Sequence, residues 1–302
     1  MEKVDLLVVG GGAAGMSAAL AAAGAGPVSV LLVDREERLG GILPQCIHQG
    51  FGLGYFQRNL TGPEYAARIV AQMEGAAVSV RLNTTVLSLS QRRTAELSGP
   101  GGYEPVAFRR LILATGCREK TIGSLPVTGT RPAGVFTAGE AQRMINLRHW
   151  RPGKKVLVLG SGDLGLIMAR RFVLEGCQVL GVVEQKGSCG GMVRNYRSCL
   201  LEHRIPLMTR TTVTQLHGEG RLTGVTLHHL DSGKEEQVAC DTLITALGLI
   251  PERELLAGLG GKLPGWASLC GNCDYVHEIV DTVTAQAEEL GHQVGMELLG
   301  RG

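Results

Sequence analysis

Two cysteines and a histidine near the end of the sequence have types and spacing that could do chemistry. Cys270 and Cys273 stand two residues apart in CGNCDYVH, residues 270–277, and His277 follows. Such a group can form part of a zinc site, a dithiol redox pair, or a helix start that contacts a cofactor. Zinc takes about four ligands, and no second pair lies near in sequence, so zinc is the weakest of these alternatives.

Cys46 and His48 are the candidate catalytic residues. A neighbouring imidazole can lower the pKa of a thiol and so produce the thiolate, which is the reactive form. In the alternative interpretation, Cys46 packs as a small apolar side chain and His48 hydrogen-bonds the backbone. The local sequence leaves both interpretations open.

The elements that must position this chemistry come from an internal duplication. Residues 4–15 read VDLLVVGGGAAG and residues 155–165 read KVLVLGSGDLG, so each is an apolar run that ends in Gly-x-Gly-x-x-Gly. A helix-like segment follows each loop, and then a second apolar run that ends in an acid, Asp34 or Glu184. In dinucleotide-binding loops the three glycines allow the tight turn, the approach of the pyrophosphate and the packing of helix on strand.

Each loop also provides groups that bind a dinucleotide directly. The helix N-terminus offers free N–H groups to phosphates, and the acid accepts hydrogen bonds from ribose hydroxyls. Two such sites suggest FAD in one and a nicotinamide in the other, with NAD preferred over NADP because Glu184 would repel a 2′-phosphate. The expected cofactor-binding residues are Gly10, Gly12, Ala13, Ala14, Gly15, Asp34 and Arg35 in the first copy, and Gly160, Gly162, Asp163, Leu164, Gly165 and Glu184 in the second.

Composition excludes several other classes of function. The 302 residues suggest about two domains. A net charge of +2 and 4% aromatic residues give no case for binding nucleic acid or an anionic membrane. The N-terminus lacks the basic start and unbroken apolar centre of a signal peptide, and no apolar run is long enough to span a membrane. We therefore expect a cytoplasmic protein whose eight cysteines are reduced.

Two further strands carry a resemblance to a known family. RRLILATGCREK (109–120) and TLITALGLIP (242–251) are apolar runs with similar endings, and they look like paired crossovers between two domains. The chain resembles the two-domain FAD/NAD(P)-dependent pyridine nucleotide oxidoreductases, which include thioredoxin and glutathione reductases. This resemblance implies an α/β fold with two Rossmann-like three-layer domains, the NAD domain being inserted into the FAD domain. It also implies cofactor contacts at Gly40, Gly41, Val86, Ala114, Thr115, Gly116, Gly248, Gly271 and Asn272.

The implied domain boundaries follow from the two crossovers. Residues 1–120 and 250–302 would bind FAD, and residues 121–249 would bind NAD(P). In such proteins the last strand ends in Gly-Asp, and a helix then points its N-terminus at the flavin. Here Gly271-Asn272 takes that place, and apolar spacing predicts a helix over residues 274–290. Cys270 and Cys273 would then flank a cofactor contact, and a redox role for them stays open.

The chain departs from the disulfide reductases. VFTAGEAQRMINLRHWRPGKK (135–155) holds no cysteine, whereas thioredoxin reductases carry a Cys-x-x-Cys there. Only Cys46 follows Gly40-Gly41, whereas glutathione-reductase-like enzymes carry two cysteines and a further C-terminal domain, which we do not expect in a chain that ends at residue 302. These differences disfavour disulfide reduction.

Three phrases narrow the resemblance. GGILPQCIHQGFGL (40–53), RPAGVFTAGEAQRMIN (131–146) and GMVRNYRSCLLEHRIPL (191–207) resemble FAD/NAD-binding subunits of multi-subunit dehydrogenases, such as hydrogen cyanide synthase, opine oxidase and a protein associated with anaerobic glycerol-3-phosphate dehydrogenase. We therefore expect an oligomeric oxidoreductase that passes electrons between NAD(H) and a partner dehydrogenase subunit. A self-contained NADH oxidase or peroxidase that uses Cys46, and a non-catalytic flavin-binding subunit, are the alternatives.

Overall fold

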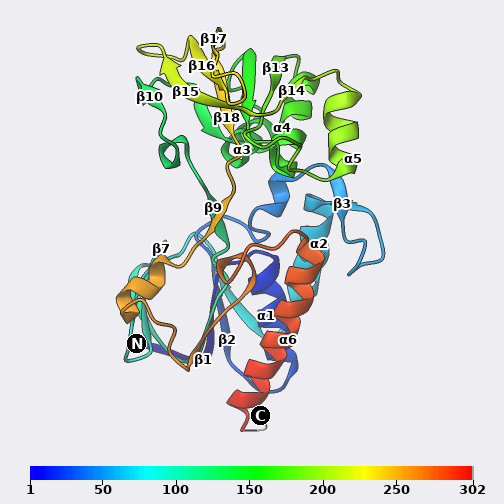
Figure 1. The fold of residues 1–302 in the computed structure, drawn as a ribbon. Coiled ribbons are helices and arrows are strands. Elements are labelled where there is room, and N and C mark those ends of the chain that lie inside the picture. The colour runs from blue at the N-terminus through cyan, green and yellow to red at the C-terminus, as the bar shows by residue number, and fades with distance from the viewer. Residues whose placement is uncertain (301–302) are drawn as a thin grey trace. The chain divides into compact units, whose positions relative to one another are not determined.

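A computed structural model describes residues 1–300 and divides the chain into two compact units (Figure 1). The first unit consists of Met1–Arg118 together with the described residues from Ile250 onward. The second unit is Glu119–Leu249, so the chain leaves the first unit, completes the second and returns. Two short strands pair where the chain passes between the units, namely β9 (Cys117–Glu119) and β19 (Leu249–Pro251).

The first unit is built on a seven-stranded sheet with the order β5-β2-β1-β8-β7-β6, in which β20 also pairs with β8. Its central strands are parallel, and β7 is antiparallel to both of its neighbours, β6 and β8. The register pairs Leu7 of β1 with Leu31 of β2 and Leu111 of β8. The strands are β1 (Glu2–Val9), β2 (Val30–Val33), β5 (Val78–Arg81), β6 (Thr85–Ser90), β7 (Thr94–Gly99), β8 (Gly102–Leu113) and β20 (Ala267–Leu269).

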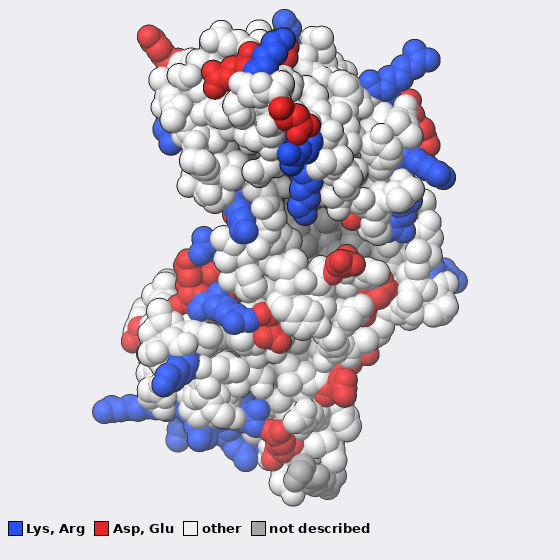
Figure 2. Space-filling model, in the orientation of Figure 1, with Lys and Arg blue, Asp and Glu red and all other residues white. Residues whose placement is uncertain are grey.

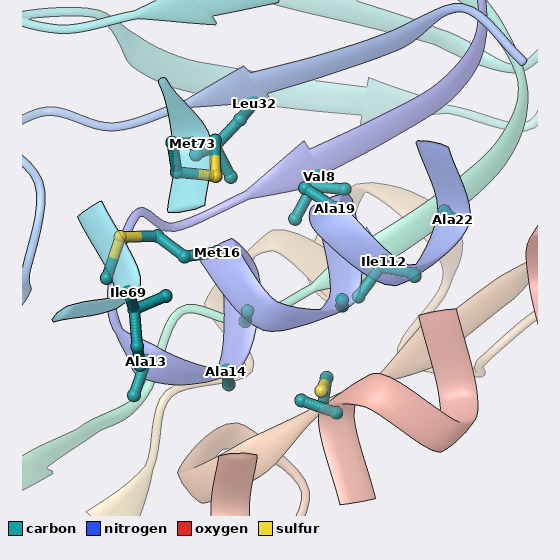
Figure 3. Close-up of a cluster of buried hydrophobic side chains, with 14 of the residues drawn as sticks. Val8, Ala13, Ala14, Met16, Ala19, Ala22, Leu32, Ile69, Met73 and Ile112 are labelled. Carbon is teal, nitrogen blue, oxygen red and sulfur yellow. The ribbon is translucent and has the colours of Figure 1, made fainter. Parts of the chain in front are cut away.

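Successive residues of the central strands are buried on opposite faces of the sheet. The sheet is therefore covered on both faces and forms the middle of three layers. Leu6 and Val8 of β1 pack with the helices, whereas Leu7 and Val9 pack with β6 and β7. Figure 3 shows the helical face, where small and apolar side chains of α1 meet side chains of the sheet and of α2. The helices of this unit are α1 (Ala13–Gly24), α2 (Gly62–Met73) and α6 (Val280–Leu298), and its 3-10 turns are η1 (Leu43–Gln45), η4 (Glu254–Leu259) and η5 (Gly271–Cys273).

Helices α1 and α6 pack closely because both present small residues to each other. A Cβ placed on Gly291 of α6 would lie 2.2 Å from the carbonyl oxygen of Ala18 in α1. One turn further along, a Cβ on Gly295 would lie 2.8 Å from the carbonyl oxygen of Ala22. The spacing of Gly291 and Gly295 therefore lets the backbones of two helices approach, a role that the sequence did not reveal to us.

The helix expected over residues 274–290 is wrong at its start, because α6 begins only at Val280. In the segment before Val280, backbone N–H and carbonyl groups form hydrogen bonds with side chains in place of helical hydrogen bonds. The guanidinium of Arg253 donates to the carbonyl oxygen of Cys273 at 2.7 Å and also to that of Asp274, and the side chain of Asn272 accepts the N–H of His277. These contacts compete with the first helical turn and hold the segment in an irregular form.

The second unit combines two sheets. A parallel sheet has the order β11-β18-β12-β13-β14, and a second sheet has the order β10-β15-β16-β17. Val156 and Val158 of β12 pack with the helices of residues 138–148 and 163–174, whereas Leu157 and Leu159 pack against the second sheet. The elements are β10 (Thr128–Gly129), β11 (Val135–Thr137), α3 (Ala138–Arg148), β12 (Lys155–Leu159), α4 (Asp163–Leu174), β13 (Gln178–Val183), α5 (Val193–Asn195), the π-helical turn η3 (Tyr196–Leu201), β14 (Leu207–Met208), β15 (Thr211–His217), β16 (Gly224–His229), β17 (Glu235–Val238), β18 (Thr242–Thr245) and the 3-10 turn η2 (Ile122–Ser124).

The surface carries charges of both signs. Figure 2 shows basic and acidic side chains on both units, with wide uncharged areas between them. None of the helices in the described part of the chain combines the length and the apolar character needed to span a bilayer.

Candidate functional site

The first glycine loop lies between β1 and α1 at the carboxyl end of the parallel strands. Gly10 has φ +111°, and a Cβ there would lie 2.3 Å from the carbonyl oxygen of Ala114. A Cβ on Gly15 would lie 1.7 Å from the carbonyl oxygen of Gly10. These two glycines are therefore required by the fold itself, because any side chain would collide with backbone.

Gly12 is different, because nothing in the protein requires it. Its φ is −77°, and the nearest heavy atom to a Cβ there would be the Cα of Gly41, at 3.8 Å. Gly40 closes the loop from the other side, where its N–H donates to the carbonyl oxygen of Gly11 at 2.8 Å. The space beside Gly12 would let a phosphate approach the backbone closely, which is the role of this glycine in dinucleotide-binding loops.

Asp34, at the end of β2, has acceptor capacity left for a ribose. Its carboxylate accepts the N–H of Gly11 and, at 2.8 Å, the N–H of Glu36, and Asp34 is buried while Arg35 is exposed. An ionised carboxylate offers about four acceptor positions. The remaining positions are those that ribose hydroxyls would use in a dinucleotide site.

The second loop repeats this geometry within the second unit. A Cβ on Gly160 would lie 2.3 Å from the carbonyl oxygen of Ala246, the counterpart of the contact between Gly10 and Ala114. A Cβ on Gly165 would lie 2.4 Å from the carbonyl oxygen of Gly160. Gly162, whose φ is −64°, would place a Cβ where no heavy atom lies within 4 Å. The space beside Gly162 is thus as open as that beside Gly12.

Glu184, at the end of β13, takes the place of Asp34. Its carboxylate accepts the N–H of Ser161 at 3.0 Å, the hydroxyl of Ser161 at 2.5 Å and the N–H of Lys186 at 2.8 Å. Burial alone would raise the pKa of Glu184, but the hydrogen bonds from Ser161 and Lys186 outweigh it and lower the pKa below its usual value. The acid is therefore ionised at neutral pH.

The repeat extends to a threonine that follows β5 in the first unit and β14 in the second. The N–H of Thr84 donates to the carbonyl oxygen of Asp34 at 2.9 Å, and that of Thr211 donates to the carbonyl oxygen of Glu184 at 3.0 Å. Each hydroxyl also donates to the carbonyl two residues before it, at 2.9 Å. Sequence reasoning missed this pair, although Thr-Thr-Val occurs at both 84–86 and 211–213.

Val86 packs in the core, and Asp163 forms hydrogen bonds with a neighbouring loop. Val86 lies in β6 with its side chain in the core, opposite the helical face. Asp163 accepts the N–H of Met192 at 2.8 Å and the side-chain amide of Asn195 at 2.7 Å, so it holds the loop that follows β13. Leu164, beside it in the first turn of α4, is half-buried against the apolar core.

The crossovers bring the remaining expected residues to the edges where the loops lie. The N–H of Ala114 donates to the carbonyl oxygen of Val9 at 2.8 Å, next to the first loop. Thr115 donates its hydroxyl to the carbonyl oxygen of Glu252 at 2.6 Å, and Gly116 accepts the N–H of Glu252. In the second unit, Gly248 accepts the N–H of Lys120 at 2.9 Å.

Gly271 and Asn272 lie beside the first turn of α1. Gly271 has φ +67°, and a Cβ on it would lie 2.8 Å from the Cβ of Ala14. The last strand places this pair there, since the N–H of Cys270 donates to the carbonyl oxygen of Leu113 at 2.8 Å. The pair thus stands at the same edge of the sheet as the first glycine loop.

Cys46 is half-buried, and its pKa is raised and not lowered. Burial raises the pKa of Cys46 to about 12, the opposite direction from a thiol made reactive by an imidazolium. The thiol contacts the carbonyl oxygen of Ile42 at 3.5 Å, while Nδ1 of His48 lies 3.0 Å from the carbonyl oxygen of Gln49. The thiol is therefore protonated at neutral pH, and the geometry favours the packing interpretation.

Cys270 and Cys273, unlike the half-buried Cys46, are buried thiols. Burial raises the pKa of Cys270 to about 12, and the sulfur of Cys273 lies 2.9 Å from the carbonyl oxygen of Leu113. A dithiol at a helix start would have lowered pKa values, but α6 begins well after both cysteines. All eight cysteines are free thiols, and residues 1–300 contain no group of three or more His, Cys, Asp or Glu side chains that could hold a metal ion.

Comparison with known proteins identifies the family. A sequence model of the pyridine nucleotide-disulphide oxidoreductases matches residues 4–268. The chain belongs to this family. The resemblance in the sequence is thereby confirmed, and the chain is an FAD/NAD(P)-dependent oxidoreductase whose family implies FAD and a pyridine nucleotide.

Curated relatives include two bacterial proteins. The chain is 28% identical over 290 residues to hydrogen cyanide synthase subunit HcnB of Pseudomonas protegens, a match that covers 85% of this chain and 59% of the relative. It is 26% identical over 283 residues to an opine oxidase subunit of Agrobacterium tumefaciens, and that match covers 86% of this chain and 55% of the relative. The chain therefore spans less than two thirds of the length of these relatives.

A solved structure shows the same fold. Thioredoxin reductase of T. acidophilum matches with a TM-score of 0.76 and 21% identity, and the match covers 99% of each chain. The expected fold class, an α/β fold with two Rossmann-like domains, is confirmed by this match.

Proposed function

We propose that the first unit binds FAD, that the second binds NAD in preference to NADP, and that the chain passes electrons between NAD(H) and a partner dehydrogenase subunit. The repeated glycine loop is the observation that carries the proposal. Gly12 and Gly162 both stand beside open space. The preceding residue in each loop donates its backbone N–H to a carboxylate, that of Asp34 in the first unit and that of Glu184 in the second. When bound, the two cofactors supply hydride transfer between nicotinamide and flavin, and the protein supplies position and electrostatics.

The chain's own residues divide this work between the units. The N–H groups at the starts of α1 and α4 point at the loops and favour pyrophosphate there. Asp34 and Glu184 offer acceptors for ribose hydroxyls, and Glu184 is ionised, so it would repel a 2′-phosphate. This repulsion supports NAD as the preferred nicotinamide cofactor.

The relatives and one loop of this chain support a partner protein. HcnB and the opine oxidase relative are both named as subunits. In this chain, the loop from Ile42 to Phe56 exposes Ile42, Ile47 and Leu53 to solvent. Asp281 holds that loop in place by accepting the N–H groups of Gly52 (3.2 Å) and Tyr55 (2.8 Å). A fixed loop with exposed apolar side chains suits contact with another protein chain.

The proposal is tested with the purified chain. It should contain noncovalent FAD and should oxidise NADH with an artificial dye as acceptor, while oxygen should replace the dye only slowly. Small amines and alcohols should not reduce the isolated chain. Oxidation of such a substrate by the chain alone, at rates on the order of 10 per second, would contradict the role of a partner.

The loop is tested in the same assay. Leu53→Asp should leave the dye activity unchanged, because Leu53 is half exposed (51%) and lies away from both glycine loops in sequence. The same change should reduce coupled turnover when chains that co-purify from the native source are added. Glu74→Lys, a charge change at the exposed end of α2, is the control and should alter neither activity.

A further inference from the structure

Ser161 lies inside the second glycine loop, directly before the open Gly162. It is buried, with 1% of its surface exposed. Its hydroxyl oxygen lies 2.5 Å from Oε2 of Glu184 and 2.7 Å from the backbone nitrogen of Gly190. One hydroxyl group therefore joins the acid at the end of β13 to the loop that follows that strand.

The two contacts fix the direction of the Ser161 hydroxyl. An ionised carboxylate only accepts hydrogen bonds, and Glu184 is ionised at neutral pH, so the hydroxyl donates its proton to Glu184. A backbone N–H only donates, so Gly190 donates to a lone pair of the same oxygen. Hydrogen bonds that run in one direction through a shared group strengthen one another. The charge on Glu184 thus supports the bond that holds Gly190.

Side chains on both sides of Gly162 hold the loop that contains Gly190. Ser161, before Gly162, accepts the N–H of Gly190. Asp163, after Gly162, accepts the N–H of Met192 at 2.8 Å. The position of this loop therefore borders the open space beside Gly162, where a phosphate would approach the backbone.

The first unit holds its corresponding loop without a side chain. There the N–H of Gly40 donates to the backbone carbonyl oxygen of Gly11 at 2.8 Å. Gly11 has no room for a hydroxyl group, because a Cβ on it would lie 2.6 Å from Cδ2 of Leu39 and 2.9 Å from Oδ2 of Asp34. The loop of the second unit thus depends on a side-chain hydroxyl that can be removed, whereas the loop of the first unit does not.

We propose that Ser161 is a positioning residue for the dinucleotide site of the second unit: its hydroxyl directs the carboxylate of Glu184 and holds the loop at Gly190. Without the hydroxyl, Glu184 would keep its bonds to the N–H groups of Ser161 and Lys186, and the N–H of Gly190 would lose its acceptor. Both changes should weaken binding of the dinucleotide. This inference rests on the proposed function, and measurements with and without nucleotide separate the two.

The first measurement needs no nucleotide. Ser161→Ala removes the hydroxyl and keeps the backbone N–H that bonds Glu184. Hydrogen exchange in residues 186–192, followed by mass spectrometry, should become about tenfold faster, the change expected for the loss of one hydrogen bond. Ser161→Gly, which introduces the residue type that the first loop carries at Gly11, should behave in the same way. Circular dichroism and flavin content establish that each variant is folded and that its first site is intact.

The second measurement is the binding of NAD⁺ and NADP⁺ to the flavin-containing chain, followed by calorimetry. The oxidised nucleotides cannot reduce the flavin, so binding is observed without turnover. Ser161→Ala should weaken NAD⁺ binding about fivefold or more. It should weaken NADP⁺ binding less, because Glu184 would favour only the nucleotide with free ribose hydroxyls. The preference for NAD⁺ should therefore fall, whereas a general loss of packing would weaken both nucleotides equally.

Ser188→Ala is the matched control. Ser188 is exposed in the same loop, and the change removes an identical hydroxyl group. Hydrogen exchange of the loop and both dissociation constants should stay within about twofold of those of the unaltered chain, as for most surface substitutions.

The outcomes are distinguishable. If the unaltered chain binds neither nucleotide, the proposed function of the second unit fails, and this inference fails with it. If it binds NAD⁺ and both Ser161 variants bind it as tightly, the positioning role of Ser161 is overturned while the proposed function stands. Faster exchange with an unchanged preference for NAD⁺ would mean that the hydroxyl holds the loop but does not direct Glu184, which also contradicts the inference.

Discussion

The carboxylate of Glu184 accepts both the backbone N–H and the hydroxyl of Ser161, at 3.0 Å and 2.5 Å. In the first unit, Asp34 accepts only the N–H of Gly11 at the corresponding position, because glycine has no hydroxyl. The second loop is thus tied to its acid by one more bond than the first. Ser161 also accepts the N–H of Gly190 at 2.7 Å, so its hydroxyl links three segments of the second unit.

Gly12→Ala and Gly162→Ala should each weaken one cofactor site and spare the other. The protein leaves room for both methyl groups, so neither change should alter the fold. Gly12→Ala should weaken FAD binding, and Gly162→Ala should weaken NADH binding, each by about tenfold or more because the added carbon takes the space of a phosphate. Flavin content and NADH titration of the two variants provide the measurement. Full retention of both cofactors in both variants would refute the assignment of the loops.

Glu184→Ala should reduce the preference for NADH over NADPH by about tenfold or more. The change removes the acceptor for the ribose hydroxyls and the charge that would repel a 2′-phosphate. Stopped-flow reduction by NADH and by NADPH at equal concentrations measures the ratio. Asp231→Ala, which removes an exposed carboxylate of the same unit, is the matched control. An unaltered chain that already reacts equally fast with both cofactors would contradict the role of Glu184.

Cys46 should resist alkylation by iodoacetamide in the folded protein at pH 7.5. Burial raises its pKa to about 12, so on the order of one thiol in 10⁴ to 10⁵ would be ionised at that pH. Because a raised pKa favours the protonated thiol, its reactivity should increase only as the pH rises toward 12 or as the chain unfolds. Mass spectrometry of the modified peptides locates the label. Rapid labelling of Cys46 at pH 7.5 would revive the peroxidase alternative.

Gly291→Ala should lower the free energy of unfolding by about 1–3 kcal/mol. The added methyl group would lie 2.2 Å from the carbonyl oxygen of Ala18, so α1 and α6 would have to move apart. Gly24→Ala, at the end of α1, is the control because a Cβ there meets no heavy atom within 4 Å. That change should be neutral or stabilise by about 0.4–1 kcal/mol. Denaturant unfolding of both variants measures the difference.

Sequence alone was sufficient for the loops and for the class of enzyme. A tight turn from strand to helix requires glycine at Gly10 and Gly160. An acid at the end of the next strand completes the pattern, so the glycines and the acid lie within a short stretch of chain. The alternation of apolar residues in β1 likewise follows from the period of a strand. These features are local, and a single sequence therefore displays them.

Tertiary structure alone decided which groups are reactive and which way they face. The cysteines could be reactive by their sequence context, but the segments that pack around the half-buried Cys46 and the buried Cys270 shield them from water and raise their pKa values. The close contact of Gly291 with Ala18 and the direction of the Asn272 amide toward Cys117 join residues far apart in the chain. Burial and hydrogen-bond polarity depend on neighbours that only folding brings together, so no spacing rule along the sequence could have given them.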